Sequence, residues 1–412
     1  MMYNAYHYSK EALRPLNFSS ELIGKLSDKY SLPLVGRYLR ANAEMIERFT
    51  KKYPKVPFGL DHTIIDDKKI SVTEEVAVSK PFCDLIHFKR DGDFNHPSVI
   101  FVAPMAGHYA SLLRGTLNEF LPDHEVYVTD WKNPRDIPLS EGDFGFDDFV
   151  SYIIDFIKHL GPDTHMVSAC QPCPGVLAAV AVLAMQKDKN QLKSLTLMAG
   201  PVDSQINCPK IIKNMPKLSI PLLKKLVINR VPRAYAGRGR RVYAGFRQLS
   251  FFMSMNIKLH IKKHVGFYLN MLKNRHNEAE AHRVFYDNYM SVMDGTETMY
   301  IDTIQRVFYE NQLPKGEMEY KGKLVDTQAI EKTALLTVEG ENDEFCPPGQ
   351  TKAAHTICSK IPKKMQGHHL QKGVGHYGVF AGSKFNKITA PLIKKFIQAA
   401  IASKPVPAEL KL

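Results

Sequence analysis

The sequence lacks any long apolar run, any apolar segment near its first residue and any dense group of cysteines. Its longest uncharged apolar stretch, around Val176 to Met185, is far too short to cross a bilayer. The first 18 residues contain no apolar region of the kind found in secretory signals. Six cysteines spread over 412 residues form no disulfide framework and suit a reducing compartment. We therefore expect a soluble, cytoplasmic protein.

Acidic residues are absent from one long segment. Between Ser204 and Asn277 there is no Asp or Glu, whereas sixteen Lys and Arg occur, and the whole chain has a net charge of +13. Such a segment is either a solvated face or a surface for an anionic partner. No nucleic-acid-binding motif accompanies it, so nucleic acid is not an expected partner.

Short apolar runs without alternation are separated by helical patterns along much of the chain. Strands are expected at 98–104, 125–131, 165–169, 194–200 and 333–340, with helices at 147–160 and 174–186. Strands of this kind, separated by helices, indicate a parallel sheet that is buried on both faces.

The domain organisation follows from where this alternation starts and stops. Some 130 residues between the fourth and fifth strands read as helical, aromatic and rich in methionine, which predicts a helical cap inserted into an α/β core. The predicted N-terminal helices include a Ser-capped segment at 19–26. The expected units are an N-terminal helical and short β segment (1–90), the first part of the core (91–203), a basic cap (204–325), the second part of the core (326–401) and a frayed tail (402–412).

Cys170 and Cys173 stand where the third strand meets a helix, and three interpretations compete. A zinc site would need a second ligand pair, and the chain has no other C-x-x-C. A thiol-disulfide couple is suggested because C-x-P-C after a strand resembles the arrangement in thioredoxin, although that fold is much shorter. The third interpretation is a nucleophile on a sharp strand-to-helix turn.

The nucleophile interpretation makes further demands on the sequence. In an α/β-hydrolase the nucleophile is followed, in chain order, by an acid and a histidine on later loops. Cys170 takes the nucleophile position, Asp343 follows the fifth strand, and His376 lies between glycines on a later loop. His368 and His369 are rival histidines, but they lie in an expected strand that leads into this loop.

An oxyanion hole is the last expected part of such a site. The loop after the first strand supplies Met105 and Ala106, and the residue after the nucleophile is Gln171. Backbone N–H groups at these two places hold the oxyanion in α/β-hydrolases. Every part of the site therefore occurs in the required order.

Several segments carry a family resemblance: "SACQP", "APMAGHYASLLRGT", "GRGRRVYAGFRQLSFFMSMN", "ALLTVEGENDEF" and "HLQKGVGHYGVFAGSKF". In them the chain resembles the intracellular poly(3-hydroxybutyrate) depolymerases, Cys-nucleophile α/β-hydrolases that mobilise stored polyester granules in bacteria. The resemblance implies that Cys170 is the nucleophile, Asp343 the acid and His376 the base. The chain departs from the family pattern at Cys173 and at Cys346, which is close to the acid.

The resemblance also implies a function. The implied protein is a carboxylic ester hydrolase that needs no metal or organic cofactor and acts on polyhydroxyalkanoate in cytoplasmic granules. The implied partners are the polymer and the granule surface, with its anionic coat proteins or lipid. The basic residues at 210–247, including Lys224, Lys225, Arg240 and Arg241, are expected to dock there. A polyester synthase-like acyltransferase and a non-catalytic granule-binding protein are the alternatives. The sequence does not separate water from coenzyme A as acyl acceptor, and gives no oligomeric state.

Overall fold

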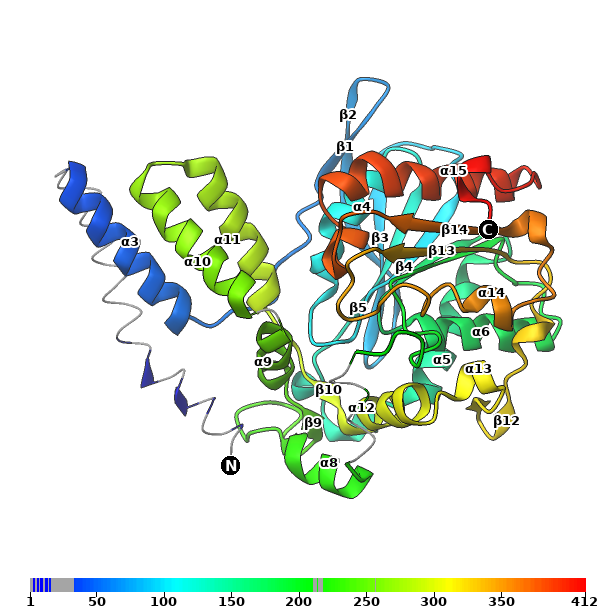
Figure 1. Cartoon of the computed structure of the whole chain (residues 1–412), viewed down its shortest axis with the longest axis horizontal. Coiled ribbons are helices and arrows are strands. Elements are labelled where there is room, and N and C mark those ends of the chain that lie inside the picture. Colours follow the sequence, from blue (N-terminus) through cyan, green and yellow to red (C-terminus); the bar gives the residue numbers. More distant parts are fainter. Residues whose placement is uncertain are drawn as a thin grey trace.

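The computed structural model describes residues 33–209, 218–255 and 257–412, together with residues 3, 6, 8, 9, 12, 13, 15 and 213. The predicted Ser-capped segment at 19–26 lies outside the described residues. The described part forms an α/β body with a helical arm at one side (Figure 1). Within this part, no helix is both long and apolar enough to span a membrane.

A nine-stranded sheet forms the centre of the body, in the order β1-β2-β3-β5-β4-β6-β7-β13-β14. The first four strands in this order pair antiparallel, and the pairs from β5 to β14 are parallel. Its strands are β1 (His62–Ile65), β2 (Lys68–Ser79), β3 (Cys83–Arg90), β4 (Ser98–Val102), β5 (Glu125–Trp131), β6 (His165–Ala169), β7 (Ser194–Met198), β13 (Ala334–Gly340) and β14 (Gln366–Gln371).

Helices cover both faces of this sheet, with α5 and α6 on one side and α4 and α15 on the other (Figure 1). The strands β6, β7 and β13 are buried at every residue because both of their faces are covered. The arrangement confirms the predicted α/β-hydrolase fold. The covering helices are α4 (Arg114–Phe120), α5 (Phe146–Leu160), α6 (Cys173–Met185), α14 (Ala354–Ile357) and α15 (Ala390–Ile401).

After β7 the chain leaves the sheet and builds the cap, which is mostly helical as predicted. It also contains a small sheet in the order β10-β9-β8. The helices of the cap are α8 (Ile220–Val227), α9 (Gly245–Met255), α10 (Ile257–Leu272), α11 (His276–Met290), α12 (Glu297–Asp302), the π-helix η5 (Thr303–Tyr309) and α13 (Gln312–Lys315). Its strands are β8 (Ile228–Arg230), β9 (Arg241–Tyr243), β10 (Gly295–Thr296), β11 (Glu319–Tyr320) and β12 (Lys323–Leu324).

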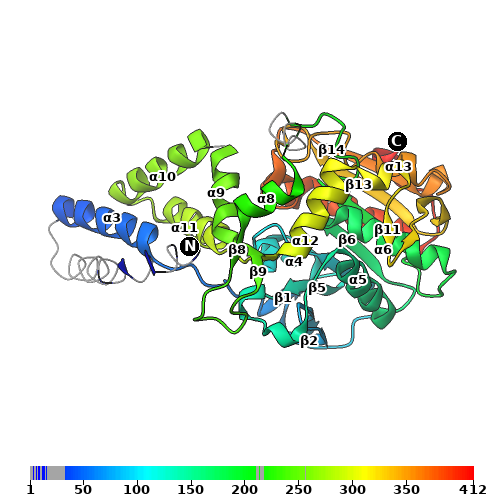
Figure 2. The same cartoon turned by 90° about the horizontal axis from the view of Figure 1, so that it is seen from below.

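The arm consists of α3 (Pro33–Thr50) packed beside α10 and α11 (Figures 1 and 2). Two ion pairs join α3 to α11. Arg48 contacts Asp287 at 2.9 Å, and Arg283 contacts Glu44 at 2.6 Å. The N-terminal helix therefore packs on the cap, although more than 200 residues separate them in the sequence.

Two predicted boundaries differ from the structure. The boundary between residues 90 and 91 divides strands of one sheet, because β1 pairs with β2, β2 with β3, and β3 with the core strand β5. The tail at 402–412 is not frayed throughout. Val406 and Leu410 are buried, and the N–H of Val406 donates to the carbonyl of Lys364 at 2.8 Å. Burial of these two apolar side chains fixes the segment against the core.

Candidate active site

Cys170 occupies a strained turn between β6 and α6. Its φ is +65°, in the left-handed region that residues with a Cβ rarely adopt. The turn is held by two backbone hydrogen bonds, from the Cys170 N–H to Met198 (2.8 Å) and from the Cys173 N–H to Cys170 (3.2 Å). Gly200 leaves the room for it, since a Cβ there would lie 2.3 Å from the Cys173 sulfur. The turn thus presents the thiol at the carboxyl edge of the sheet.

The structure brings Cys170, His376 and Asp343 together from three loops at this edge. The distance from Cys170 Sγ to His376 Nε2 is 3.1 Å, and from His376 Nδ1 to Asp343 Oδ2 it is 2.8 Å. The other carboxylate oxygen of Asp343 accepts the N–H groups of Phe345 (2.9 Å) and Cys346 (2.8 Å). This fixes the carboxylate, so it can orient the imidazole ring.

The electrostatics of these groups favour a protonated histidine. His376 and Asp343 are each only 5% exposed. Burial would lower the pKa of His376, but the charges of Asp343 and Cys170 and its hydrogen bonds to both raise this pKa well above its usual value. The N-terminus of α6 starts three residues after Cys170 and attracts negative charge. The His376 ring and the N-terminus of α6 therefore both lie beside the Cys170 thiol.

The rival histidines lie elsewhere. His368 bonds to the hydroxyl of Thr337 at 2.9 Å, and burial lowers its pKa to about 4. The ring of His369 lies 3.0 Å from the side-chain oxygen of Gln371. Both lie within β14, as expected from the sequence, so of these three histidines only His376 contacts Cys170.

The predicted oxyanion residues all line the same pocket as Cys170. Met105 differs from the others because its N–H points to the side-chain oxygen of Gln171 at 3.4 Å, which is longer than a good hydrogen bond. Within the described residues, no acceptor binds the N–H of Ala106 or of Gln171. These two N–H groups are therefore the best-placed oxyanion donors, and Met105 is the weaker candidate.

One residue of the site escaped the sequence reasoning. His108 lines the pocket, and its Nε2 lies 3.1 Å from the carbonyl oxygen of Tyr289 in α11. Burial lowers the pKa of His108 to about 4, so its ring is neutral near pH 7 and donates its single N–H to the Tyr289 carbonyl. His108 therefore ties the oxyanion loop to the cap. His108 lies within the motif "APMAGHYASLLRGT", so this motif could have identified it as a candidate site residue.

The cap closes an apolar cavity of about 350 Å³ over the triad. Among the described residues that line it there is no Lys, Arg or Glu and no Asp. Aromatic and methionine side chains of the cap form much of its wall, including Phe251, Phe252, Met255, Met299 and Tyr300. Among the same described residues, no group of three or more His, Cys, Asp and Glu is placed to hold a metal ion.

Cys173 packs beneath the turn rather than facing the pocket. It is fully buried, and its sulfur lies 3.4 Å from the Ser168 carbonyl oxygen and 3.8 Å from that of Met198. Burial raises the pKa of this thiol to about 12, so it remains neutral. As predicted, it is a residue of the first turn of the following helix, and its geometry does not favour the redox interpretation.

We predict that Cys173→Ala keeps ester hydrolysis near the wild-type rate and lowers the free energy of unfolding by about 1 kcal/mol, as a small loss of core packing. Cys358→Ala is the matched control, because Cys358 is equally buried and its pKa is also raised to about 12. Hydrolysis and thermal unfolding are measured for both variants. A loss of activity confined to Cys173→Ala would contradict this view and favour a thiol-disulfide couple.

Comparisons with known proteins identify similar solved structures and one matching family model. No curated protein sequence matches it. Similar solved structures include a 2-hydroxy-6-oxo-6-phenylhexa-2,4-dienoate hydrolase from a Rhodococcus species (11% identity, 80% of this chain and 100% of that chain, TM-score 0.43). Another is the monoacylglycerol lipase of Paleococcus ferrophilus (13% identity, 74% and 97%, TM-score 0.41).

The family model described as the PHB de-polymerase C-terminus, where PHB is poly(3-hydroxybutyrate), matches residues 199–401. The match begins after Cys170 and includes Asp343 and His376. Residues 199–401, about half of the chain, thus match the PHB depolymerase family of ester hydrolases.

Proposed function

We propose that the protein hydrolyses stored poly(3-hydroxybutyrate) through a thioester formed on Cys170. The observation that carries this proposal is the 3.1 Å contact between Cys170 Sγ and His376 Nε2, at the base of an apolar cavity. In this arrangement the thiol on the strained turn is the nucleophile. The histidine is its base, and the buried carboxylate orients that base.

The first half of the reaction forms the acyl-enzyme. The Cys170 thiolate attacks the ester carbonyl, a C–S bond forms, and the carbonyl oxygen becomes an oxyanion held by the N–H groups of Ala106 and Gln171. Loss of one such donor costs about 3–4 kcal/mol of transition-state stabilisation. The C–O bond then breaks, and His376 gives its proton to the departing alkoxide. The second half reverses these roles: neutral His376 takes a proton from water, the water oxygen attacks the thioester, and the thiolate leaves.

The lining of the cavity supports a neutral polyester as substrate. Its apolar and aromatic walls match short aliphatic hydroxyacyl units, and the charged side chains that a phosphorylated acyl acceptor would need are absent among its described lining residues. This supports hydrolysis over transfer to coenzyme A. The test incubates purified protein with amorphous granules and measures released hydroxyacid, with and without coenzyme A. Hydrolysis that needs no coenzyme A is expected. Formation of acyl-CoA alone would favour the acyltransferase, and no product would favour a non-catalytic binding protein.

The structure changes which residues serve as candidates for granule docking. The expectation that Arg240 is a surface cation is wrong, because its guanidinium is buried and donates to the carbonyls of Ile137, Pro138 and Gly142. Lys224 and Arg241 both pair with the carboxylate of Glu297. Lys210 lies outside the described residues. The segment at 210–247 therefore offers less free charge than its composition indicates.

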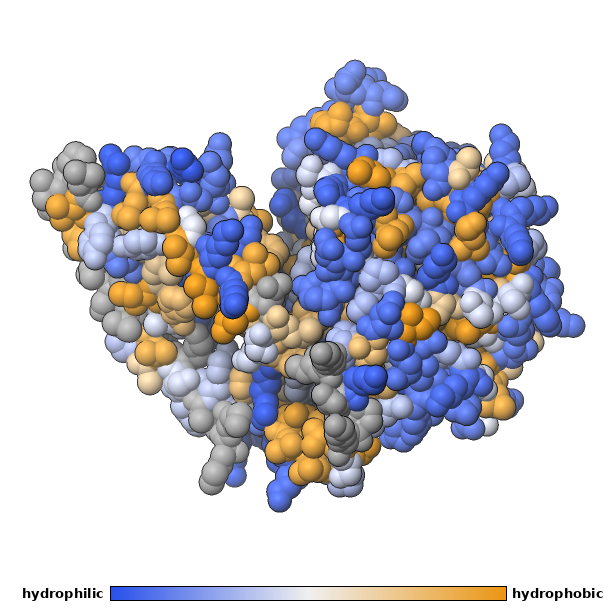
Figure 3. Space-filling view, in the orientation of Figure 1, coloured by the Kyte–Doolittle hydropathy of each residue, from blue (hydrophilic) through white to orange (hydrophobic). Residues whose placement is uncertain are grey.

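Helix α10 is a better docking surface. Ile257, Ile261, Val265 and Leu269 recur every four residues, so they form one stripe, and each is more than 40% exposed. Lys258, Lys262 and Lys263 are exposed around this stripe, and the helix has no acidic residue. Apolar and hydrophilic side chains lie side by side over the arm in Figure 3. Such a face suits an apolar surface with an anionic coat, and α9, which precedes α10, reaches into the active-site cavity.

We predict that replacing Ile257, Ile261 and Val265 together by asparagine weakens cosedimentation with native granules several-fold, because exposed apolar area is lost from the contact. Hydrolysis of a small soluble ester should not change. The matched control replaces Ile64, Leu139 and Leu324, whose exposures of 52%, 54% and 58% are close to those of the test residues (56%, 57% and 54%). Equal binding by both triple variants and the wild type would rule out α10 as the docking face.

A further inference from the structure

A large cavity lies at the amino-terminal ends of the central strands, opposite the ends that carry Cys170. Its volume is about 770 Å³. Its walls are the loop between α6 and β7, the loops that precede β13 and β14, and the end of α15. The strands β7 and β13 begin here, at Ser194 and Ala334, and β13 spans roughly 20 Å before it reaches the acid loop of the active site. The proposed ester hydrolysis does not use this cavity.

Positive charge dominates the lining of this cavity. It contains seven lysines and only three acidic residues, Asp188, Asp326 and Glu331, which leaves four positive charges in excess. In the part of the chain that the structure describes, none of the seven ammonium groups forms an ion pair or a hydrogen bond, whereas Asp188 already pairs with Lys158 outside the cavity at 2.9 Å. The lysines are Lys187, Lys189, Lys193, Lys332, Lys360, Lys364 and Lys404.

The lysines do more than complement the ends of the helices. Both α6 and α15 end beside the cavity, and the carbonyl end of a helix carries about half a negative charge, which attracts cations. Two such ends balance roughly one of the four excess charges. The remaining excess is carried by lysines that are mostly exposed around a concave site, where charges of one sign concentrate the field and attract an anion.

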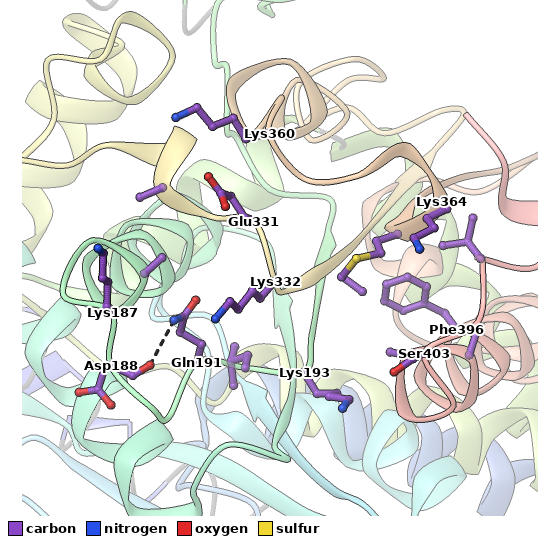
Figure 4. Close-up of a pocket in the computed structure, with 18 of the residues that line it drawn as sticks. Lys187, Asp188, Gln191, Lys193, Glu331, Lys332, Lys360, Lys364, Phe396 and Ser403 are labelled. Carbon is purple, nitrogen blue, oxygen red and sulfur yellow. Dashed lines mark hydrogen bonds between the residues drawn. The ribbon is translucent and has the colours of Figure 1, made fainter.

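Three of the lysines surround the hollow from separate loops. Figure 4 shows Lys193, Lys332 and Lys364 on different sides of it, with Phe396 of α15 in one wall. Backbone hydrogen bonds fix the main chain at two of these lysines. The Lys193 N–H donates to the Thr164 carbonyl at 3.0 Å, and the Lys364 carbonyl accepts from Val406 at 2.8 Å. Apolar side chains, among them Leu192, Phe396 and Val406, line the same cavity.

We propose that this cavity binds a small ligand with a chain of two or more phosphates, and that its apolar wall receives an organic group such as a nucleoside. Ammonium groups bind phosphate oxygens as point charges, and several of them around one hollow suit a multivalent anion. The volume lies in the range of pockets that hold ligands of nucleotide size. This inference does not depend on the proposed function, because no residue of the cavity belongs to the active site.

The test titrates the full chain with ATP, AMP, adenosine and inorganic tripolyphosphate in a calorimeter. One saturable site is expected, with affinity in the order ATP, AMP, adenosine, and with ATP binding weakened by added salt. If tripolyphosphate binds as tightly as ATP, the site recognises the phosphate chain alone. If tripolyphosphate binds more weakly than ATP, the apolar wall also contacts the nucleoside. Absence of binding by both ATP and tripolyphosphate would overturn the proposal.

Two sets of variants locate the site. Lys193→Gln, Lys332→Gln and Lys364→Gln together should lower ATP affinity at least about 100-fold, since each lost charge-assisted contact costs roughly tenfold. The control changes Lys68, Lys315 and Lys323 to Gln, which removes three exposed lysines outside the cavity. Thermal unfolding checks that both variants are folded, and protein alkylated at Cys170 should bind ATP unchanged. An equal loss of ATP affinity in both triple variants would show that binding responds only to the net charge of the protein, and would exclude this cavity as the binding site.

Discussion

Replacing Cys170 by alanine is expected to lower the rate of ester hydrolysis by about ten-thousand-fold or more, because the members of such a triad act as a unit. The thiol is half-buried, and its contact is with His376, so the fold should survive its removal. Release of hydroxyacid from amorphous granules and cleavage of a soluble ester both measure the loss. Circular dichroism and thermal unfolding show whether the variant is folded.

The control for this variant is Cys208→Ala. Cys208 is also a half-buried free thiol, its sulfur contacts only the carbonyl of Pro209 among its hydrogen-bond partners, and it lies outside the active-site cavity. This variant should keep full activity. Iodoacetamide should label Cys170 first in the wild type and in the control, because thiolate character sets the rate of alkylation. If Cys170→Ala retained most of its activity, the thioester mechanism would be wrong.

Replacing His376 by alanine is expected to cost nearly as much as losing Cys170, since the ring both protonates the alkoxide and activates water. Asp343→Asn should cost less, because Asp343 orients the ring and takes no proton. The matched controls are His368→Ala and His369→Ala, which remove imidazoles from β14 that do not reach the thiol. Activity retained in His376→Ala and lost in a control would identify another histidine as the base.

The Asp343→Asn variant also tests the charge balance of the site. The Asp343 carboxylate contributes to the raised pKa of His376, so its replacement should lower that pKa. The imidazolium that stabilises the thiolate is then lost at a lower pH. The alkaline limit of kcat/KM should therefore move to lower pH, while the wild type stays active further into the alkaline range. An unchanged alkaline limit would show that Asp343 does not control the protonation of His376.

Much of the fold was predictable because the buried parallel strands need apolar side chains on both faces. The strands predicted at 165–169, 194–200 and 333–340 correspond to β6, β7 and β13, which are buried at every residue. The edge of the sheet was harder to predict. Most residues of β2 are exposed, so its sequence carries a short β pattern but no sign of which strand it joins. Pairing between β3 and β5 depends on contacts that local pattern does not encode.

The site shows the same division. Cys170, Asp343 and His376 could be selected because each follows a recognisable strand in the order that the fold requires. His108 could not be assigned a role, since its partner is a carbonyl 181 residues further along the chain. Arg240 was misjudged for a similar reason. Its guanidinium donates to backbone carbonyls about 100 residues earlier in the chain, so it is buried and not available at the surface.

The separation of the triad along the chain has a consequence for the timing of synthesis. His376 lies 206 residues after Cys170, on the loop that follows the last strand to join the sheet. At a translation speed of about 5–20 residues per second, roughly 10–40 s pass between the synthesis of the two residues. During this interval the thiol has no imidazole to activate it. A ribosome-bound chain can therefore fold its central strands and meet other cellular esters before it acquires the ability to cleave them.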